Sequence, residues 1–326
     1  MIVDNAGIRC RSLTECPSCK QSSQVVHEQL TDRIFGAPGT WSFRRCVDPR
    51  CGLMWVDPMP FPDETIKLYD AYYTHPPDEG VEEPSSVNTG PKAAVKSILA
   101  RLLPHRRHVY LSRLGYLEDL APGRVLEVGC GSGAFLRQVT RAGWSAFGLD
   151  FDPQAIAAIC ALPGVEARVG DLLSMQFEAA LFDAVVMNNV IEHLSDPKAV
   201  FSECSRILKR GGQLVMVTPS SASLGYRTFG EDWRGLEVPR HLYVFSPTAL
   251  KKFATDAGFE KAVTFSTAGG FTGTQMLLFS DQLKASRKGS SATMTSRAAA
   301  RAIRREHFSI LFGHDVGEWA VLVATN

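Results

Sequence analysis

The chain has 326 residues, 45% of them hydrophobic, which is enough for one large domain and a small one. Its formal net charge of +1 excludes a global attraction to nucleic acid or to an anionic membrane. The N-terminus has an early Asp and no apolar run, and no apolar stretch approaches the roughly 20 residues that cross a bilayer. We therefore expect a soluble, cytoplasmic protein without a membrane span.

Four cysteines near the N-terminus are spaced like the ligands of a structural zinc ion. Cys16 and Cys19 form a C-x-x-C pair, and four residues separate Cys46 from Cys51. Four thiolates from two short turns suit tetrahedral zinc, and a segment this small could hardly fold on apolar burial alone. A redox C-x-x-C would precede a helix in a βαβ context, which is absent here. The wide second pair leaves Cys10 as an alternative to Cys46.

Composition divides the chain into three parts. Residues 1–73 hold the paired cysteines and form the expected zinc-binding module. Residues 74–92 are rich in Pro, Glu, Ser and Gly, which is typical of a linker. Residues 93–326 form the expected main domain, whose first part is helical in pattern.

Strand and helix signals alternate from residue 124 onward. Strands are expected over 124–128, 145–150, 183–188, 213–218 and 319–324, with a weaker one near Val263. Helices are expected over 132–142, from 152, from 196 to Gly211 and from 246 to Gly258. This alternation predicts an α/β fold with a mostly parallel sheet and helices on both faces. Ligands of such sheets bind beyond the carboxyl ends of the strands.

A glycine-rich turn follows the first of these strands. It reads Glu127-Val-Gly-Cys-Gly-Ser-Gly133 and opens a helix, so that the main chain can turn tightly and a ligand can approach it. Asp150 ends the next strand and can accept hydrogen bonds from ribose hydroxyls, and Asp171 follows the third strand, where an adenine amine could donate. A fold that binds NAD is the alternative, but the glycine spacing lacks the G-x-G-x-x-G order.

With FDAVVMNNVIEHL at 182–194 and LKRGGQL at 208–214, these motifs resemble the class I S-adenosylmethionine-dependent methyltransferases. The resemblance implies a Rossmann-like fold with a seven-stranded sheet, and S-adenosylmethionine as the cofactor. The cofactor-binding residues it implies are Glu127, Gly129, Cys130, Gly131, Gly133, Asp150, Phe151, Asp171, Leu172 and Asn188.

The resemblance also assigns parts of the cofactor to these positions. The three glycines wrap the methionine part, Glu127 orders their loop, and Asp150 holds the ribose. Asp171 and the main chain of Leu172 face the adenine, and Asn188 lies under the methionine end. Cys130 is a small thiol packed within the loop. A catalytically inactive relative is the alternative, although no part of the motif is broken.

The N-terminal segments CPSC, CGLMWVDPMP and YDAYYTH resemble the zinc-binding region that precedes many bacterial methyltransferase domains. Those enzymes include sugar C-methyltransferases and tailoring or polysaccharide-cluster methyltransferases. Four thiolates leave no open coordination position, so we expect the zinc to fold a module that flanks the substrate rather than to do chemistry.

Two histidines are candidates for the base that a hydroxyl acceptor needs. Glu192-His193 follows the fourth strand, and His241 lies in the segment WRGLEVPRHLYVF at 233–245. That segment resembles an acceptor-side loop of the same enzymes, in which Trp233, Arg240 and Tyr243 could line a pocket. The alternative for all of them is ordinary packing against the sheet.

The basic segment from Lys284 to Phe308 could contact an anionic acceptor or a membrane surface. The alternative, which we favour, is a solvated helix face or a mobile insertion. The segment therefore adds no functional assignment to those above.

The expected function is methyl transfer to a hydroxyl of a small molecule or glycan, in secondary-metabolite or polysaccharide biosynthesis. Three alternatives remain open. A sugar C-methyltransferase would carry a further C-terminal domain, whereas we expect this chain to end on its last strand. An RNA methyltransferase could use the zinc ribbon, but the near-neutral charge and the N-N-V-I sequence at 188–191 do not favour nucleic acid. A non-catalytic scaffold is the third. The acceptor and the oligomeric state are left open.

Overall fold

The computed structural model describes residues 2–69, 114–160, 163–269, 271–291 and 293–326. The expected linker at 74–92 and the helical pattern that begins at residue 93 lie outside the described residues. The division into an N-terminal module and a main domain therefore stays a prediction at its boundaries.

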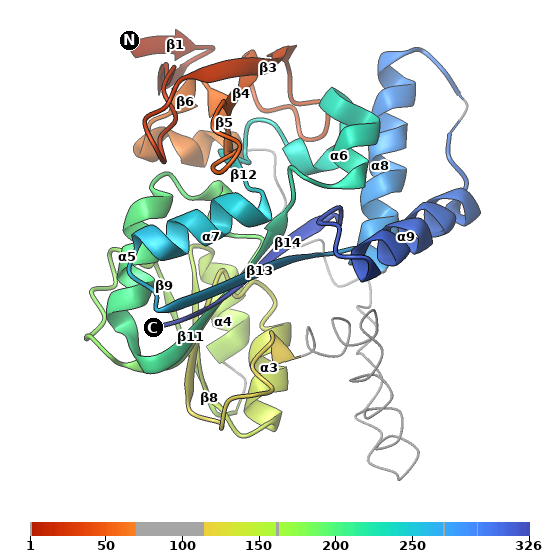
Figure 1. Cartoon of the computed structure of the whole chain (residues 1–326). Coiled ribbons are helices and arrows are strands. Elements are labelled where there is room, and N and C mark those ends of the chain that lie inside the picture. The colour runs from red at the N-terminus through yellow and green to blue at the C-terminus, as the bar shows by residue number, and fades with distance from the viewer. Residues whose placement is uncertain (1, 70–113, 161–162, 270, 292) are drawn as a thin grey trace.

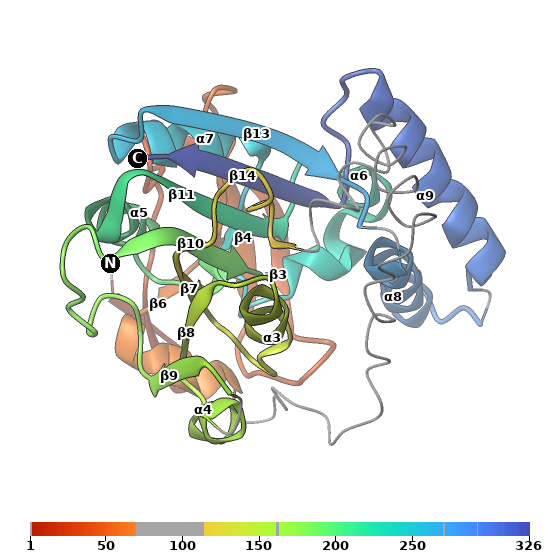
Figure 2. The same ribbon diagram turned by 90° about the horizontal axis from the view of Figure 1, so that it is seen from below.

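The centre of the molecule is a seven-stranded sheet (Figures 1 and 2). Its strands, in spatial order, are β13 (Lys261–Thr267), β14 (Trp319–Thr325), β11 (Leu208–Pro219), β10 (Phe182–Asn188), β7 (Arg124–Val128), β8 (Ser145–Asp150) and β9 (Val165–Val169). The five strands from β11 to β9 are parallel, and β14 is antiparallel to both of its neighbours. The expected α/β fold with a mostly parallel sheet of seven strands is confirmed.

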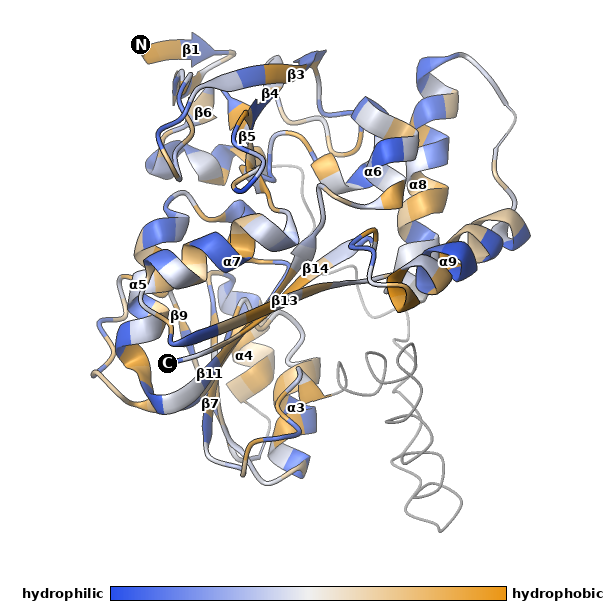
Figure 3. Cartoon of the chain, viewed as in Figure 1, coloured by the Kyte–Doolittle hydropathy of each residue, from blue (hydrophilic) through white to orange (hydrophobic). Residues whose placement is uncertain are grey.

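Helices cover both faces of this sheet (Figure 2). The helices are α3 (Ala134–Arg141) and α4 (Pro153–Cys160) on one face, and α5 (Pro197–Ile207) and α7 (Pro247–Asp256) on the other. Strand residues alternate between the two cores, so that Val125 packs with α3 and α4 whereas Leu126 packs with α5 and α7. Figure 3 shows hydrophilic and hydrophobic stretches on both α5 and α7, as helices with one packed face require.

The predicted helix starts at Asp196 and Ser246 are confirmed by their caps, whereas the helix expected from residue 132 begins at Ala134. The side chain of Asp196 accepts from the amide of Ala199, and Ser246 accepts from Ala249, each over 3.1 Å. The predicted end of the first of these helices at Gly211 is wrong. It ends at Ile207, because β11 begins at Leu208 and takes the following residues into the sheet.

Two small sheets form the N-terminal part. One contains β1 (Ile2–Asn5), β2 (Ile8–Arg11) and β6 (Met59–Pro60). The other contains β3 (Ser23–Leu30), β4 (Trp41–Cys46), β5 (Met54–Asp57) and β12 (Tyr243–Val244). Tyr243 pairs with Trp55 and Val244 with Met54, so the second sheet includes a strand from the expected acceptor segment. The N-terminal part and that segment therefore share main-chain hydrogen bonds.

Five short helical segments and two longer helices, α8 and α9, complete the described part of the fold. They are η1 (Pro62–Tyr69), η3 (Ile191–His193), α6 (Leu224–Phe229), η4 (Gly230–Asp232), η5 (Arg234–Leu236), α8 (Phe271–Arg287) and α9 (Ser296–Leu311). Helices α8 and α9 lie beyond one end of β13 and β14 (Figure 1). Within the described part of the chain, none of the helices is both long and apolar enough to traverse a bilayer.

Candidate functional site

The glycine loop connects β7 to α3 at the carboxyl edge of the sheet. Gly129, Gly131 and Gly133 have φ values of 71°, 45° and 69°, which favour glycine. A Cβ on Gly129 would lie 2.4 Å from the side chain of Val190, just beyond β10. The loop therefore packs directly against the segment that leads to His193, and no larger residue fits at position 129.

Glu127 lies beneath this loop. Its side chain is buried, and one carboxylate oxygen has no hydrogen-bond partner among the described residues. Burial, together with the charge of Asp150, raises the pKa of Glu127 well above its usual value. A buried polar atom without a partner is costly, so this oxygen can be satisfied by a donor that arrives with a ligand.

Asp150 ends β8 and holds the loop through main-chain amides. Its carboxylate accepts from the amide of Gly131 over 2.8 Å and from that of Asp152 over 3.0 Å. The next residue, Phe151, keeps 54% of its surface exposed, although it is aromatic. Its ring lies 6.0 Å from that of Tyr69, at the end of η1. An exposed aromatic ring beside a fixed carboxylate is a surface on which a flat, polar ligand can lie.

The remaining predicted cofactor residues follow neighbouring strands. Asp171 comes after β9 and accepts from the amides of Leu173 and Ser174 over 3.0 and 3.1 Å. Burial acts to raise the pKa of Asp171, but the hydrogen bonds of Ser174 and Leu173 outweigh it and lower the pKa. The side chain of Leu172 is buried, and Asn188 is the last residue of β10. Because β7, β8, β9 and β10 are parallel neighbours, all these residues gather at one edge of the sheet.

His193 and His241 meet beside this edge. Their ring centroids are 4.7 Å apart in a T-shaped arrangement. The Nδ1 atom of His193 lies 3.0 Å from the carbonyl oxygen of Arg240, and that of His241 lies 2.8 Å from the carbonyl oxygen of Gly235. A carbonyl oxygen only accepts, so both Nδ1 atoms carry the hydrogen and both Nε2 atoms keep a lone pair. The sequence predicted both histidines at the site but not this shared tautomer.

The histidines are neutral at neutral pH. Burial lowers the pKa of His241 to about 3, although the nearby charge of Glu237 opposes that shift. Burial also lowers the pKa of His193, which is only half-buried. Both rings are therefore available as proton acceptors.

Glu192 is the third member of the group, with a ligand-type atom within 4.8 Å of both histidines. Its side chain is 1% exposed, and neither carboxylate oxygen has a hydrogen-bond partner among the described residues. Burial raises the pKa of Glu192 to about 8, so its carboxyl is largely protonated at neutral pH.

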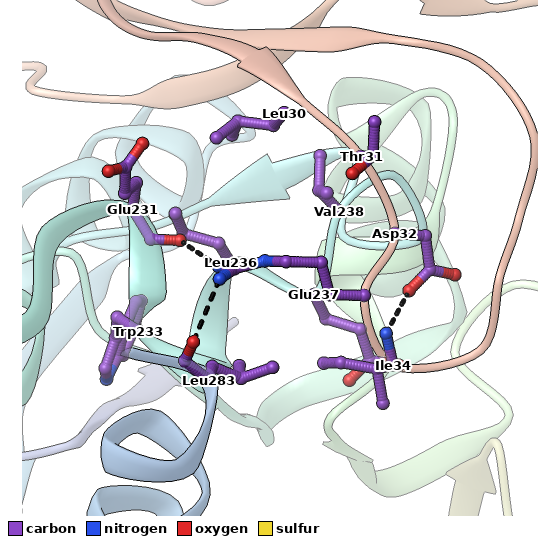
Figure 4. A pocket seen from close by; sticks show the side chains of 11 residues that line it. Leu30, Thr31, Asp32, Ile34, Glu231, Trp233, Leu236, Glu237, Val238 and Leu283 are labelled. Carbon is purple, nitrogen blue, oxygen red and sulfur yellow. Dashed lines mark hydrogen bonds between the residues drawn. The ribbon is translucent and has the colours of Figure 1, made fainter. Parts of the chain in front are cut away.

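Two other acceptor-side candidates, Trp233 and Tyr243, are buried and hydrogen-bonded. Trp233 donates to Glu318 over 2.8 Å, and the Tyr243 hydroxyl donates to the carbonyl oxygen of Ser195 over 3.3 Å. Trp233 also lines a small cavity between the N-terminal loop 30–34 and the segment 231–238 (Figure 4). Packing is therefore a demonstrated role for these two aromatic residues.

Sequence reasoning missed three residues that the fold brings to this region. Tyr69 places its hydroxyl 3.1 Å from Nδ1 of His193. Glu237 lies 3.6 Å from Nε2 of His241, and Asp32 forms an ion pair with Arg240 over 2.8 Å. Tyr69 and Glu237 lie within segments that the motif analysis singled out, but nothing in the local sequence marks Asp32.

The four N-terminal cysteines converge as predicted. Cys16 and Cys51 have Sγ atoms 3.7 Å apart, and those of Cys19 and Cys46 are 3.4 Å apart. All four Sγ atoms lie within 4.8 Å of one another. Tetrahedral zinc with Zn–S bonds near 2.3 Å requires S–S separations of about 3.8 Å, whereas a disulfide needs about 2.05 Å. The geometry is consistent with a small zinc site. Cys10 lies outside this group.

The basic segment falls on the end of α8 and on α9. Its exposed arginines include Arg301, Arg304 and Arg305, whereas Glu306 is buried. Burial, followed by the charge of Glu318, raises the pKa of Glu306 to about 9. The exposed face of α9 is therefore basic, which both interpretations of the segment predict.

Comparisons with known proteins agree with this geometry. A family model described as "Methyltransferase domain" matches residues 98–263. A ubiquinone biosynthesis O-methyltransferase of Xanthomonas oryzae pv. oryzae is 32% identical over 142 residues, which cover 39% of this chain and 58% of the relative. A probable S-adenosylmethionine-dependent methyltransferase of Mycolicibacterium smegmatis is 33% identical over 167 residues, which cover 51% of this chain and 62% of the relative.

Solved structures also include similar chains. A SAM-dependent methyltransferase of Thermotoga maritima, described as a possible histamine N-methyltransferase, is 20% identical with a TM-score of 0.45. The similarity covers 71% of this chain and 95% of that one. Against the two curated relatives, by contrast, the chain spans less than two thirds of their length.

Proposed function

The chain belongs to the methyltransferase-domain family, and on this premise we propose that it transfers a methyl group from S-adenosylmethionine to a hydroxyl of a small-molecule or glycan acceptor. Secondary-metabolite or polysaccharide biosynthesis is the proposed setting. The observation that carries the proposal is the pair of neutral imidazoles, of which His193 follows the segment that packs against the glycine loop.

The residues at the carboxyl edge fit the proposed cofactor. The glycines leave main chain accessible, Glu127 has an unsatisfied buried oxygen, and Asp150 presents a fixed carboxylate. Phe151 offers an exposed ring, and Asp171 accepts at the end of the neighbouring strand. When bound, S-adenosylmethionine supplies an electrophilic methyl group on a sulfonium. The chain's own task is then to orient the acceptor and to remove its proton.

His193 is the proposed general base. A hydroxyl proton moves to Nε2 of His193, while the Nδ1–H bond to the Arg240 carbonyl holds the ring in place. His193 is half-buried, so an acceptor can reach it, whereas His241 is buried and supports it from the side. The Glu192 carboxyl, neutral through burial, adds no negative charge beside the imidazole.

Oxygen is the proposed methylated atom because a hydroxyl needs a base, and the site contains one. The names of the Xanthomonas relatives, which refer to an O-methyltransferase, support this proposal. We further propose that Cys16, Cys19, Cys46 and Cys51 hold a structural zinc ion. A closed set of four thiolates leaves no open position, so this zinc would stabilise the N-terminal module only.

The test is a screen for S-adenosylhomocysteine release with small-molecule, sugar and polysaccharide acceptors. With an acceptor that turns over, His193→Gln should lower kcat by about 10²–10⁴-fold, the range typical of a lost general base. His314→Gln, at an exposed histidine, is the control and should match the parent. Parent turnover in His193→Gln would refute His193 as the base, and parent turnover in His241→Gln would refute the supporting role of His241. Salt-dependent binding and methylation of RNA would instead show that the acceptor is RNA and not a small molecule or glycan.

A further inference from the structure

We propose that Asp32, in the N-terminal part of the chain, is a positioning residue for the two histidines and acts on them through Arg240. The inference rests on the proposed function, because it concerns the imidazole that removes the acceptor proton. It means that the N-terminal part completes the chemistry of the main domain, in addition to flanking the acceptor.

Asp32 is held in a fixed position by its own loop. Its Oδ1 accepts from the amides of Ile34 and Phe35 over 2.9 and 3.0 Å, and its Oδ2 accepts from that of Ala37 over 2.9 Å. Figure 4 shows the bond to the amide of Ile34 at the edge of the small cavity. Three main-chain amide donors of the same loop therefore fix the direction of the carboxylate independently of any partner side chain.

Arg240 receives its position from that carboxylate. Its Nη1 donates to Oδ2 of Asp32 over 2.8 Å and to the carbonyl oxygen of Leu68 over 3.1 Å. Its Nε lies 3.3 Å from Oε1 of Glu237, and its guanidinium carbon lies 4.3 Å from the centroid of Phe35. The side chains of Arg240 and Asp32 are 0% and 1% exposed, so solvent does not weaken their ion pair.

The fixed arginine then sets the ring of His193 directly, and it reaches His241 only through the charge of Glu237. Its main-chain carbonyl accepts the Nδ1–H of His193, and its partner Glu237 has its other oxygen 3.6 Å from Nε2 of His241. Leu68, which also binds the guanidinium, precedes Tyr69, whose hydroxyl faces the same Nδ1 of His193. Contacts from two N-terminal segments, at 32–37 and 68–69, therefore converge on Arg240 and on the ring of His193.

Charged and titratable groups surround His193 from every side. Glu192 precedes it in η3, and Tyr69 faces it from η1. From the segment 234–241 it feels the charges of Arg234, Glu237 and Arg240 and packs against His241. The Arg240 carbonyl can only accept, whereas the Tyr69 hydroxyl can also donate to Nδ1, so a small shift of that carbonyl removes the partner that selects the Nδ1–H tautomer.

Nitrogen NMR of ¹⁵N-histidine-labelled protein measures the tautomer of each histidine and needs no methyl-acceptor substrate. In the parent, His193 and His241 should show protonated Nδ1 and unprotonated Nε2, and His193→Gln assigns the first of these signals. In Asp32→Asn, an amide NH₂ replaces one anionic oxygen, so Arg240 loses its anchor. The Nδ1–H form of His193 should then fall from nearly all molecules to about half.

Asp232→Asn is the matched control. Asp232 is equally buried at the same junction, but its ion pairs join Arg33 and Arg287 instead of Arg240. Its removal should weaken the junction and leave both tautomers as in the parent. Unchanged tautomers in Asp32→Asn would overturn the proposal, and so would an equal change in Asp232→Asn.

If Asp32→Asn does not fold, Arg240→Lys replaces it, since lysine keeps the charge but cannot form the same fork of hydrogen bonds. Parent tautomers in Arg240→Lys overturn the proposal in the same way. The readout separates this inference from the proposed function. Parent turnover in His193→Gln would refute the base, whereas a tautomer change in Asp32→Asn would still establish the positioning.

Discussion

The two sides of the candidate site are built in different ways. On the cofactor side, every predicted residue lies at the carboxyl end of one of four neighbouring parallel strands or in the loop that follows it. On the acceptor side, the groups come from stretches of chain that are far apart, at 32–37, 68–69, 192–193 and 234–241. The cofactor side needs only local motifs and a regular sheet. The acceptor side forms only when the N-terminal part packs against the main domain.

This difference predicts which measured properties each group of substitutions should change. Substitutions on the cofactor side should change cofactor affinity and leave the N-terminal part intact. Substitutions in the N-terminal part should change stability and the acceptor side, and spare cofactor affinity. The experiments below separate the two sides in order of decreasing effect.

Asp150→Ala should give the largest effect. It removes the acceptor for the amides of Gly131 and Asp152 as well as the proposed ribose contact. Affinity for S-adenosylhomocysteine, measured by calorimetry, should fall by about 100-fold, since hydrogen bonds to charged groups contribute roughly 1.5–3 kcal/mol each. Asp196→Ala, which removes a helix cap elsewhere, should bind like the parent. Parent affinity in Asp150→Ala would contradict the assignment of the whole edge.

Cys16→Ser should act on the other side. Zinc content should fall well below about one ion per chain, and Tm should drop by about 5–10 °C, as the loss of a few kcal/mol implies. Affinity for S-adenosylhomocysteine should stay within about twofold of the parent in cooled samples, because the edge of the sheet is built without the cysteines. Cys10→Ser, at a buried thiol outside the cluster, should keep its zinc.

Glu192→Gln should change how stability depends on pH. Burial raises the pKa of Glu192 from its ordinary value of 4.5 to about 8 in the folded protein. Between these values the folded state holds a proton that the unfolded state has lost, so stability falls as pH rises, by about 1.4 kcal/mol per pH unit.

Urea denaturation at several pH values measures this slope. The free energy of unfolding of Glu192→Gln should lack this contribution, so that its advantage over the parent grows from pH 5 to pH 8. Glu203→Gln, on the outer part of α5, should follow the parent. Parallel curves for the parent and Glu192→Gln would show that the carboxyl is ionised in the folded state.

Asp171→Asn should have the smallest effect. The asparagine oxygen can still accept from the amides of Leu173 and Ser174 and from an adenine amine, so the loss is that of a charge alone. Affinity for S-adenosylhomocysteine should change by about threefold or less. A loss as large as that of Asp150→Ala would mean that the two acids contribute equally.

The sequence was sufficient for most of the fold. The strands at 124–128 and 145–150 have the predicted bounds, because each is an apolar run that ends at glycines or an acid. The end of α5 could not be predicted, since Lys209 to Gly212 join β11 through tertiary pairing rather than through local preference. The second sheet of the N-terminal part could not be predicted either, because its fourth strand lies about 190 residues further along the chain.

The site divides in the same way. Gly129 to Gly133 and Asp150 could be predicted from spacing alone, because the chemistry of the turn lies in consecutive residues. Spacing predicts His193 and His241 one by one, but their ring contact did not follow from it. Asp32 carries no local signal, since its importance depends on a partner 208 positions away. A buried ion pair of this kind is visible only in three dimensions.

The pairing of β12 with β5 has a consequence for how such an enzyme could be re-engineered. A chimera that takes residues 1–69 from one donor and the remainder from another would have to rebuild the Trp55–Tyr243 and Met54–Val244 register at the same time. Exchanging residues 1–69 alone would therefore leave β12 without its matched partner strand. A chimera should therefore take the N-terminal sheet and residues 234–245 from the same donor, because these two pieces of sequence pair with each other.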